Sequence, residues 1–294
     1  MTKRIRPLRS AAAAALGVLT LAGCDRSEKA DVSFAPYSQD YASKPDFAYV
    51  EHKFPLTPQQ LQTITPKYLA TLDQEQVDQI YARLTAGPIP DGPFDGNLFF
   101  PKGESGDRRV AEIIGGLKGL VVNLKGRKLE AVGRTLWKGK VFYRDEGVLR
   151  NRIEDLTLIK PFIDGDTSSL QKITMNGKDA WLLFPAKLYC GQSLLDGRRE
   201  SIIIDYAFSD GLPGYRERPD FLAGRRGLQI RDEIRMVRPG FYLGRAHANR
   251  AFLLNFTLYN QEVAERDGKA FLESGRVAED CWSGTQRATV AAAR

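Results

Sequence analysis

The chain has 294 residues, 43 Lys and Arg against 36 Asp and Glu, and a formal net charge of +7. Four of the basic residues and none of the acidic ones lie in residues 1–23, which leaves 39 basic against 36 acidic residues in the remainder. So small a surplus gives no electrostatic footprint for nucleic acid, and we expect no nucleic-acid partner. The sequence also contains no Walker loop or dinucleotide fingerprint, which argues against nucleotide-dependent chemistry.

Residues 1–23 have the pattern of a secretory signal: four basic residues precede an apolar run over residues 11–22. That run is too short to cross a bilayer as a helix, which takes about 20 residues. It ends in Leu21-Ala22-Gly23-Cys24, which resembles the lipobox of bacterial lipoproteins. The resemblance implies that residues 1–23 are a cleaved signal peptide and that Cys24 is lipidated. The alternatives are an ordinary cleaved signal and an uncleaved apolar segment.

The resemblance also implies a location in the cell envelope, with a membrane as partner through lipidated Cys24 and the domain facing the periplasm. Asp25 favours the inner membrane if the enteric sorting rule applies. In an oxidising compartment the two remaining cysteines, Cys190 and Cys281, are expected to form a disulfide, and the alternative is two buried free thiols. Closing a loop of about 90 residues contributes at most roughly 4 to 5 kcal/mol of stability.

Two segments precede the main domain. Residues 24–56 are predicted to be a tether, because polar residues dominate its beginning, although the aromatic residues of its later part favour contact with the domain surface. Residues 57–87 are predicted to be helical, with starts at Thr57-Pro58, Thr65-Pro66 and Asp73. We expect these helices to be polar outside and to pack on the main domain; the alternative is a docking surface for a partner.

Residues 88–294 are predicted to form the main domain. It begins with a turn-rich stretch and a strand over residues 94–100. A helical segment over residues 107–136 follows, in which a broad apolar stripe is bracketed by basic residues. It is expected to cover the sheet or to plug a barrel end, and the alternative is a membrane-facing or lid element.

From Trp137 onward the pattern is that of strands. Eight are predicted, and the turn signals Asn176-Gly177 and Pro239-Gly240 mark two of the hairpins. Their ranges are 139–143, 148–153, 169–175, 178–184, 202–208, 232–238, 241–248 and 252–259. With the strand over 94–100, this gives about eight or nine antiparallel strands in consecutive hairpins. Closure into an up-and-down barrel removes exposed edges, so we predict a mainly β (α+β) fold with N-terminal and covering helices.

Trp137-Lys138-Gly139-Lys140 enters this run of hairpins. It is similar to the start of lipocalin-like (calycin) barrels, which often carry Gly-x-Trp near their first strand. The likeness covers about residues 92–260 and implies a barrel that encloses a hydrophobic or amphiphilic small molecule. Trp137 is therefore a candidate ligand-binding residue.

Signals for catalysis are sparse. The only histidines are His52 and His247, and no Gly-x-Ser-x-Gly elbow is present. Residues 164–168 begin like a calcium loop, but Ser169 and Met175 stand where such loops carry Gly and Glu. We therefore predict no catalytic residue, no metal and no cofactor. His247 is kept as a candidate ligand-binding residue and, in one alternative, as the base of a hydrolase.

The loop over residues 209–231 carries four further candidates, Arg216, Arg218, Arg225 and Arg226. Arg side chains suit phosphates and carboxylates, so the loop could contact anionic headgroups or ligands at a barrel mouth. The alternative is a solvated loop neutralised by acidic neighbours.

The function predicted first is a membrane-anchored envelope lipoprotein whose barrel binds or carries a hydrophobic or amphiphilic small molecule, such as a lipid. A structural or assembly lipoprotein with a filled barrel and envelope proteins as partners is the second prediction. A hydrolase using His247 is the third.

Overall fold

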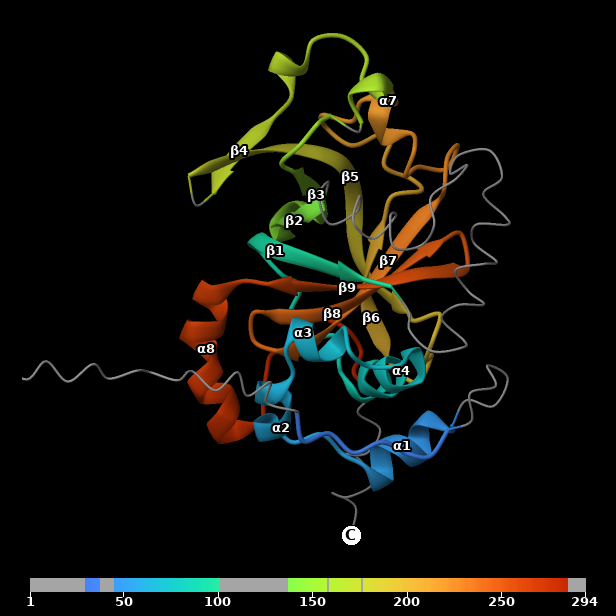
Figure 1. Cartoon of the computed structure of the whole chain (residues 1–294), viewed down its shortest axis with the longest axis vertical. Helices are drawn as coiled ribbons and strands as arrows, with labels where there is room; N and C mark the ends of the chain where they lie inside the picture. Colours follow the sequence, from blue (N-terminus) through green and yellow to red (C-terminus); the bar gives the residue numbers. More distant parts are fainter. Residues whose placement is uncertain (1–29, 38–44, 101–136, 158, 176, 285–294) are drawn as a thin grey trace, which may run out of the picture.

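The computed structural model describes residues 30–37, 45–100, 137–157, 159–175 and 177–284. Within them lie nine strands, six α-helices and short 3-10 turns (Figure 1). The strands are β1 Gly92–Phe99, β2 Trp137–Tyr143, β3 Val148–Ile153, β4 Lys172–Met175, β5 Lys178–Gln192, β6 Glu200–Asp205, β7 Ile230–Arg238, β8 Phe241–Ala248 and β9 Ala251–Tyr259. The helices are α1 Phe47–Lys53, α2 Pro58–Thr63, α3 Pro66–Leu69, α4 Gln74–Arg83, α7 Glu217–Asp220 and α8 Gln261–Ser274.

Eight of the strands close into a barrel. Each pairs antiparallel with its neighbours in the order β1, β2, β3, β5, β6, β7, β8, β9, and β9 pairs back with β1. The short β4 pairs only with the beginning of β5 and stands outside this ring. Because closure leaves no barrel strand with an unpaired edge, the predicted antiparallel up-and-down barrel is confirmed.

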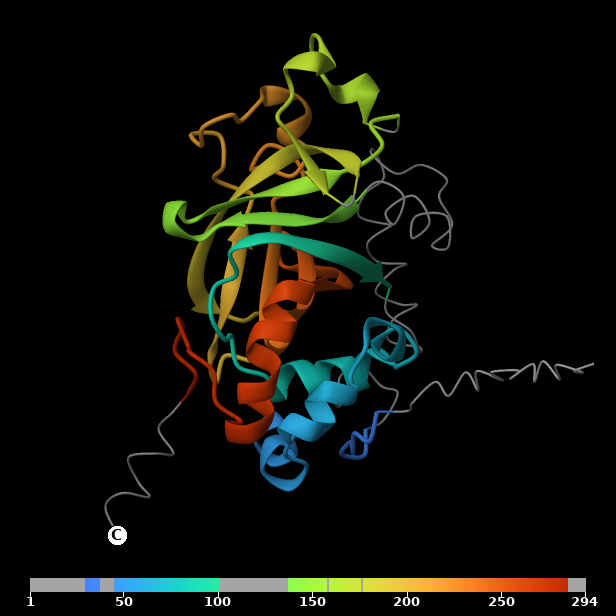
Figure 2. The ribbon, with the colours of Figure 1, turned by 90° about the vertical axis from the view of Figure 1, so that its left-hand side faces the viewer.

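The two ends of the barrel differ in what lies around them. Helices α1 to α4 gather at one end, and α7 and β4 lie at the other (Figures 1 and 2). At the α1–α4 end the interior is filled with apolar side chains, among which Phe94 packs edge-on against Phe142 and Tyr242 with ring centroids 5.5 and 5.8 Å apart. The predicted disulfide between Cys190 and Cys281 is also present.

The predicted helix starts at the N-terminal side are confirmed. Thr57 and Gln60 form a reciprocal capping box at α2, and the Thr65 hydroxyl accepts a hydrogen bond from the backbone N–H of Tyr68 at α3. Helix α8 lies outside the set predicted from sequence, although Asn260 caps its start and Gly275, with φ of 64°, ends it. The helix predicted over residues 107–136 lies outside the described residues.

The tether predicted over residues 24–56 is not a free linker in its described part. It contains α1, and Ala30 and Ala35 are buried against the helices. The backbone N–H of Ala35 donates to Gln79 Oε1 at 2.9 Å, and Gln79 Nε2 donates back to the Ala35 carbonyl at 3.0 Å. Two reciprocal hydrogen bonds and buried methyl groups hold this segment on α4.

The prediction that the N-terminal helices are polar outside is wrong for α4. Its polar residues Gln74, Asp78 and Gln79 are buried as completely as its apolar ones. One polar side faces the outer wall of the barrel, and residues 30–37 cover another. Helix α4 is therefore covered on both of these sides. Its polar side chains can be buried because the outward-facing barrel residues that they meet are polar as well.

Two strand predictions also need correction. The strand predicted over residues 202–208 is shorter in the structure: β6 ends at Asp205, and Phe208 lies beyond it and is 56% exposed. In the strand predicted over residues 252–259, regular alternation would place Phe252 and Leu254 on the same face, but the register of β8 and β9 shifts between Ala246 and His247. Phe252 therefore packs against His247, on the outer side of the wall.

Candidate binding cavity

The apolar filling stops short of the α7 end, where the barrel holds a cavity of about 310 Å³ that is open to the outside. Such a volume lies at the small end of the range for ligand pockets, which is about 300 to 1,000 Å³. Most of the lining is aliphatic or aromatic, and it comes from the barrel strands and from the loop between α7 and β7. The lining residues are Leu98, Trp137, Lys140, Asn151, Ile153, Phe184, Tyr206, Leu222, Ala223, Leu228, Ile230, Asp232, Ala246, Leu254 and Phe256.

A β-bulge lets Trp137 and Lys140 share this cavity. Residues three apart on a regular strand face opposite ways, but the register of β2 shifts between Trp137 and Gly139. Gly139 has φ of 135° and lies against the Phe94 carbonyl, so that a side chain there would collide with the backbone. The Trp137 ring occupies the space that a side chain at Gly96 would fill. Trp137, predicted as a ligand-binding residue, thus lines the cavity.

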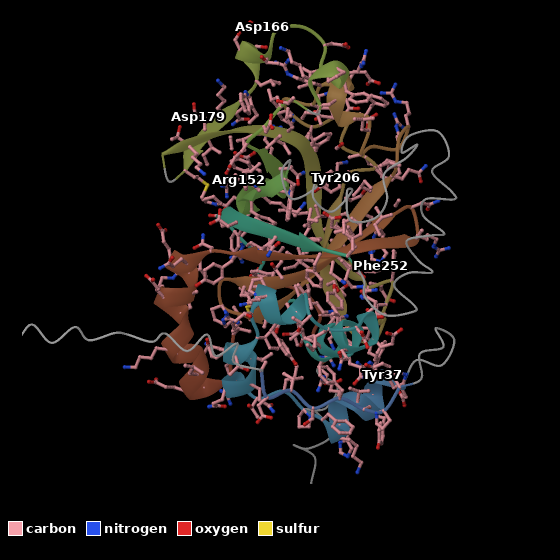
Figure 3. All side chains as sticks on the ribbon, in the orientation of Figure 1. Tyr37, Arg152, Asp166, Asp179, Tyr206 and Phe252 are labelled. Atoms are coloured by element: carbon pink, nitrogen blue, oxygen red, sulfur yellow. A yellow bond between two sulfur atoms is a disulfide. The ribbon has the colours of Figure 1, made fainter. Side chains whose placement is uncertain are left out.

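Four polar side chains meet at the cavity wall. Lys140 Nζ donates to Asp232 Oδ2 at 3.0 Å, to Asn151 Oδ1 at 3.0 Å and to the Tyr206 hydroxyl at 2.5 Å. Asn151 Nδ2 donates to the Tyr206 hydroxyl and to the Phe184 carbonyl, both at 3.0 Å. We call Lys140, Asn151, Tyr206 and Asp232 the inner cluster. All four are at least 95% buried, and Figure 3 places Tyr206 among the strands of the barrel.

Burial and mutual attraction act in opposite directions on the inner cluster. The rings of Trp137, Tyr206 and Phe256 have their centroids 5.2 to 5.4 Å from Lys140 Nζ, which favours the cation. Desolvation nevertheless lowers the pKa of Lys140 and raises the pKa of Asp232, and the ion pair opposes both shifts. The same burial, with the nearby Asp232 carboxylate, raises the pKa of Tyr206 well above 10, so its hydroxyl keeps its proton.

The loop over residues 209–231 forms one side of the cavity and is fastened to the barrel by Asp220. Leu222, Ala223 and Leu228 of this loop are lining residues. The Asp220 carboxylate accepts backbone N–H bonds from Phe184 and Arg216, both at 2.8 Å. Phe184 has φ of 52°, an unusual value for a bulky residue, and this contact fixes its position in the wall.

None of the four arginines predicted in this loop lines the cavity, and only Arg225 and Arg226 share a small hollow of about 10 Å³. Arg216 donates to Ser169, and Arg218 pairs with Asp164 at 3.2 Å. Arg225 pairs with Asp210 at 2.6 Å, and Arg226 pairs with Glu217. Each guanidinium therefore has a partner of its own at the surface, as in the solvated-loop alternative.

His247 points away from the cavity, because Ala246 takes the inward position on β8. Burial, together with the nearby Arg245 and Arg231, lowers the pKa of His247 to about 3. The nearest carboxylate oxygen recorded for it, Glu233 Oε1, lies 4.0 Å from Nε2, which is longer than a hydrogen bond. The geometry of a base held by an acid in a pocket is therefore not present at His247.

A second ionic group lies on the outer wall beneath α4, and we call Asp78, Asp196, Glu233, Arg235 and Arg245 the outer cluster. Arg235 is fully buried and donates to Ser201 Oγ at 3.0 Å, to Asp196 Oδ2 at 3.1 Å and to three backbone carbonyls. Arg245 pairs with Asp78 of α4. These bonds join the helix to β7 and β8, so this cluster connects elements of the fold.

Two further features of the described part of the chain are a group of potential metal ligands and the length of the helices. The one group of potential metal ligands found there is Cys190, Cys281 and Glu200, and its two sulfur atoms are bonded to each other. No helix among the described residues is long and apolar enough to cross a bilayer.

Comparison with known proteins adds nothing to what the fold and the cavity show. No family model and no curated protein matches the sequence. A crystal structure of a protein from Thermomonospora curvata is similar over 69% of this chain and 97% of that chain, with 16% identity and a TM-score of 0.35. A likeness this distant carries no information on function, which has to be argued from the cavity.

Proposed function

We propose that the barrel binds one small, mainly apolar molecule in the cavity at its α7 end. The observation that carries the proposal is the cavity itself: about 310 Å³ lined by Leu, Ile, Ala and aromatic side chains, in a barrel whose other end is packed. A mainly apolar pocket with a few convergent polar groups is the usual form of a small-molecule site. The inner cluster then sets the orientation of the ligand, and the apolar walls contribute most of the affinity.

The test is a fluorescent apolar probe, N-phenyl-1-naphthylamine, titrated into the full chain carrying Cys24→Ser, which cannot be acylated at that position. We expect saturable binding of one probe per chain. Ala246→Phe places a ring in the cavity and should weaken binding at least ten-fold, whereas Ala251→Phe, at an exposed position of the neighbouring strand, should not. Equal binding by both variants would refute the site, provided that their circular dichroism matches the parent.

A second readout does not depend on a variant. A ligand that binds only the folded state at about 100 times its Kd adds about 2.7 kcal/mol to the free energy of unfolding. Urea denaturation with and without saturating probe should show such an increase. In addition, native mass spectrometry of freshly purified protein should find a co-purifying molecule of lipid-like mass. Absence of both effects would contradict the proposal.

We also propose that Cys24 is lipidated and that the chain is anchored to a membrane of the cell envelope. The support is the lipobox and, independently, the disulfide, which suits an oxidising compartment. Cells fed an alkyne analogue of palmitate should label the chain, and Cys24→Ser should abolish the label. Labelling that persists in Cys24→Ser would overturn the assignment.

Lipidation at Cys24 would orient the cavity. Ala30, six residues after Cys24, is buried at the α1–α4 end, and six residues span at most about 20 Å. The anchor would therefore hold the α1–α4 end near the bilayer and direct the α7 end toward the aqueous side. Exchange of the ligand would then take place with a soluble donor or acceptor.

A further inference from the structure

The inner cluster also specifies which polar group the ligand carries, an inference that rests on the proposed function. Lys140, Asn151, Tyr206, Asp232 and Trp137 are the lining residues with polar side-chain atoms. Their donors and acceptors can be counted one by one, and a ligand can only use those that remain free.

The donors are already engaged. The three N–H groups of Lys140 go to Asp232, Asn151 and Tyr206. Both N–H groups of Asn151 are used, and the Trp137 indole N–H donates to Asn151 Oδ1 at 2.9 Å. The Tyr206 hydroxyl, which accepts two hydrogen bonds, is left to donate to Asn151 Oδ1 or Asp232 Oδ2, at 3.3 and 3.4 Å.

One strong acceptor remains. Asp232 Oδ2 receives the bonds of Lys140 and Tyr206, whereas Asp232 Oδ1 receives none from the part of the chain that the structure describes. The Asp232 side chain is 6% exposed and belongs to a residue that lines the cavity. Asp232 Oδ1 is not among the buried atoms without a partner, so it keeps accessible surface at the cavity, where a ligand donor can reach it.

Charge decides which donor fits best. The inner cluster contains one cation and one anion, so it is neutral as a whole. A ligand carboxylate or phosphate would add an unpaired negative charge beside Asp232, and it would find no free side-chain N–H group among the described lining residues. A ligand ammonium would lie close to Lys140 and be repelled by it. A neutral hydroxyl avoids both penalties.

We therefore propose that the cavity binds an apolar molecule with a neutral hydroxyl group, an alcohol rather than a fatty acid, and that Asp232 Oδ1 accepts the hydroxyl hydrogen bond. The buried lysine does not serve as an anion receptor, because Asp232, Asn151 and Tyr206 already hold its ammonium group. Chain length and shape are set by the apolar walls, and the head group is set by the inner cluster.

Three ligands of equal chain length test the proposal on the unmodified site: 1-decanol, its methyl ether and decanoate. Each displaces N-phenyl-1-naphthylamine from the Cys24→Ser chain at pH 7.5, below its solubility limit. We expect 1-decanol to bind at least ten-fold more tightly than the ether, which lacks the donor, and than decanoate, which adds the charge. Tightest binding by decanoate, or equal binding of alcohol and ether, would overturn the inference while leaving the cavity proposal intact. A probe that does not bind at all would instead overturn the proposed function.

A variant pair locates the acceptor. Asp232→Asn keeps the shape of the side chain but replaces the carboxylate, so the preference for 1-decanol over its ether should fall to less than about three-fold. Asp164→Asn removes a carboxylate that is 66% exposed and outside the cavity, and it should keep the full preference. If Asp232→Asn fails to fold, the ligand series on the unmodified site still decides between alcohol and acid.

Discussion

The same barrel wall carries two buried ionic clusters that differ in what lies next to them. On β7, Asp232 faces inward and belongs to the inner cluster, and the adjacent Glu233 faces outward and belongs to the outer cluster. The outer cluster is buried beneath α4. Its arginines form an ion pair with Asp78 of that helix and donate hydrogen bonds to neighbouring backbone carbonyls. The inner cluster adjoins empty volume. We interpret the outer cluster as a structural connection because it joins packed elements, and the inner cluster as a candidate site because it borders a cavity.

The outer cluster should show the largest effect on stability. Arg235→Met removes a fully buried guanidinium and leaves three backbone carbonyls and Ser201 with fewer donors. We expect the free energy of unfolding in urea to fall by about 3 to 5 kcal/mol. Probe affinity per folded molecule should not change. Loss of binding in a folded Arg235→Met protein would show that the two clusters are not separate in function.

The inner cluster should be more tolerant. Lys140→Met leaves Asp232 without its cation, but burial already raises the pKa of Asp232, so the carboxyl group can take up a proton. We expect a loss of about 2 to 3 kcal/mol, and recovery to within about 1 kcal/mol of the parent in Lys140→Met with Asp232→Leu, because an apolar pair replaces a buried ion pair at little cost. Urea denaturation of the two single variants and the double variant measures the coupling. Additive losses would contradict an ion pair.

Because His247 is buried beside the outer cluster, we expect the free energy of unfolding to fall in acid. Its pKa is lowered from 6.5 to about 3 in the folded protein, so between those values the unfolded chain binds a proton that the folded chain does not. Stability from this group is therefore complete above pH 6.5 and is lost as the pH falls, by about 2 kcal/mol at pH 5. The drop in unfolding free energy from pH 7 to pH 5 should be smaller in His247→Leu by that amount. Parallel pH profiles for parent and variant would argue against a neutral buried imidazole.

Asp220, which fastens the cavity loop, should give the smallest change in stability. Asp220→Asn keeps one acceptor for the backbone N–H groups of Phe184 and Arg216, so we expect a loss of about 1 kcal/mol. The expected kinetic effect is larger: the probe should leave the cavity several times faster in stopped-flow displacement. Asp210→Asn, which removes a surface ion pair with Arg225 in the same loop, serves as the control. An unchanged exit rate would mean that this loop does not limit ligand release.

Much of the fold could be predicted from the sequence. Alternating side chains and turn signals such as Asn176-Gly177 predict nine strands, and the nine strands are present. The need to pair the edge strands predicts that the sheet closes into a barrel. The bulges at Gly139 and Ala246 could not be predicted this way, because a bulge leaves no strong local pattern. They are the reason that Trp137 and Lys140 face the cavity together and that Phe252 lies on the other side.

The site was harder to predict than the fold. Sequence reasoning found Trp137 but missed Lys140, Asn151, Tyr206 and Asp232. A signal was present, since Asn151 lies two residues from both Leu149 and Ile153, and Asp232 lies two and four residues before Ile234 and Met236. A polar residue in phase with inward apolar ones marks either a buried pair or a site. The arginines of the loop were predicted as ligand-binding residues because the loop contains so many of them. In the structure, each of them has a partner at the surface.

The most direct test of the account is a crystal structure of the Cys24→Ser chain with 10-bromodecan-1-ol, in which the anomalous signal of bromine locates the ligand. The account predicts one bromine inside the barrel among apolar lining residues such as Leu98 and Leu254, with the hydroxyl oxygen within about 3 Å of Asp232 Oδ1. Bromine outside the barrel, or a hydroxyl group placed at the loop arginines with the cavity empty, would contradict it.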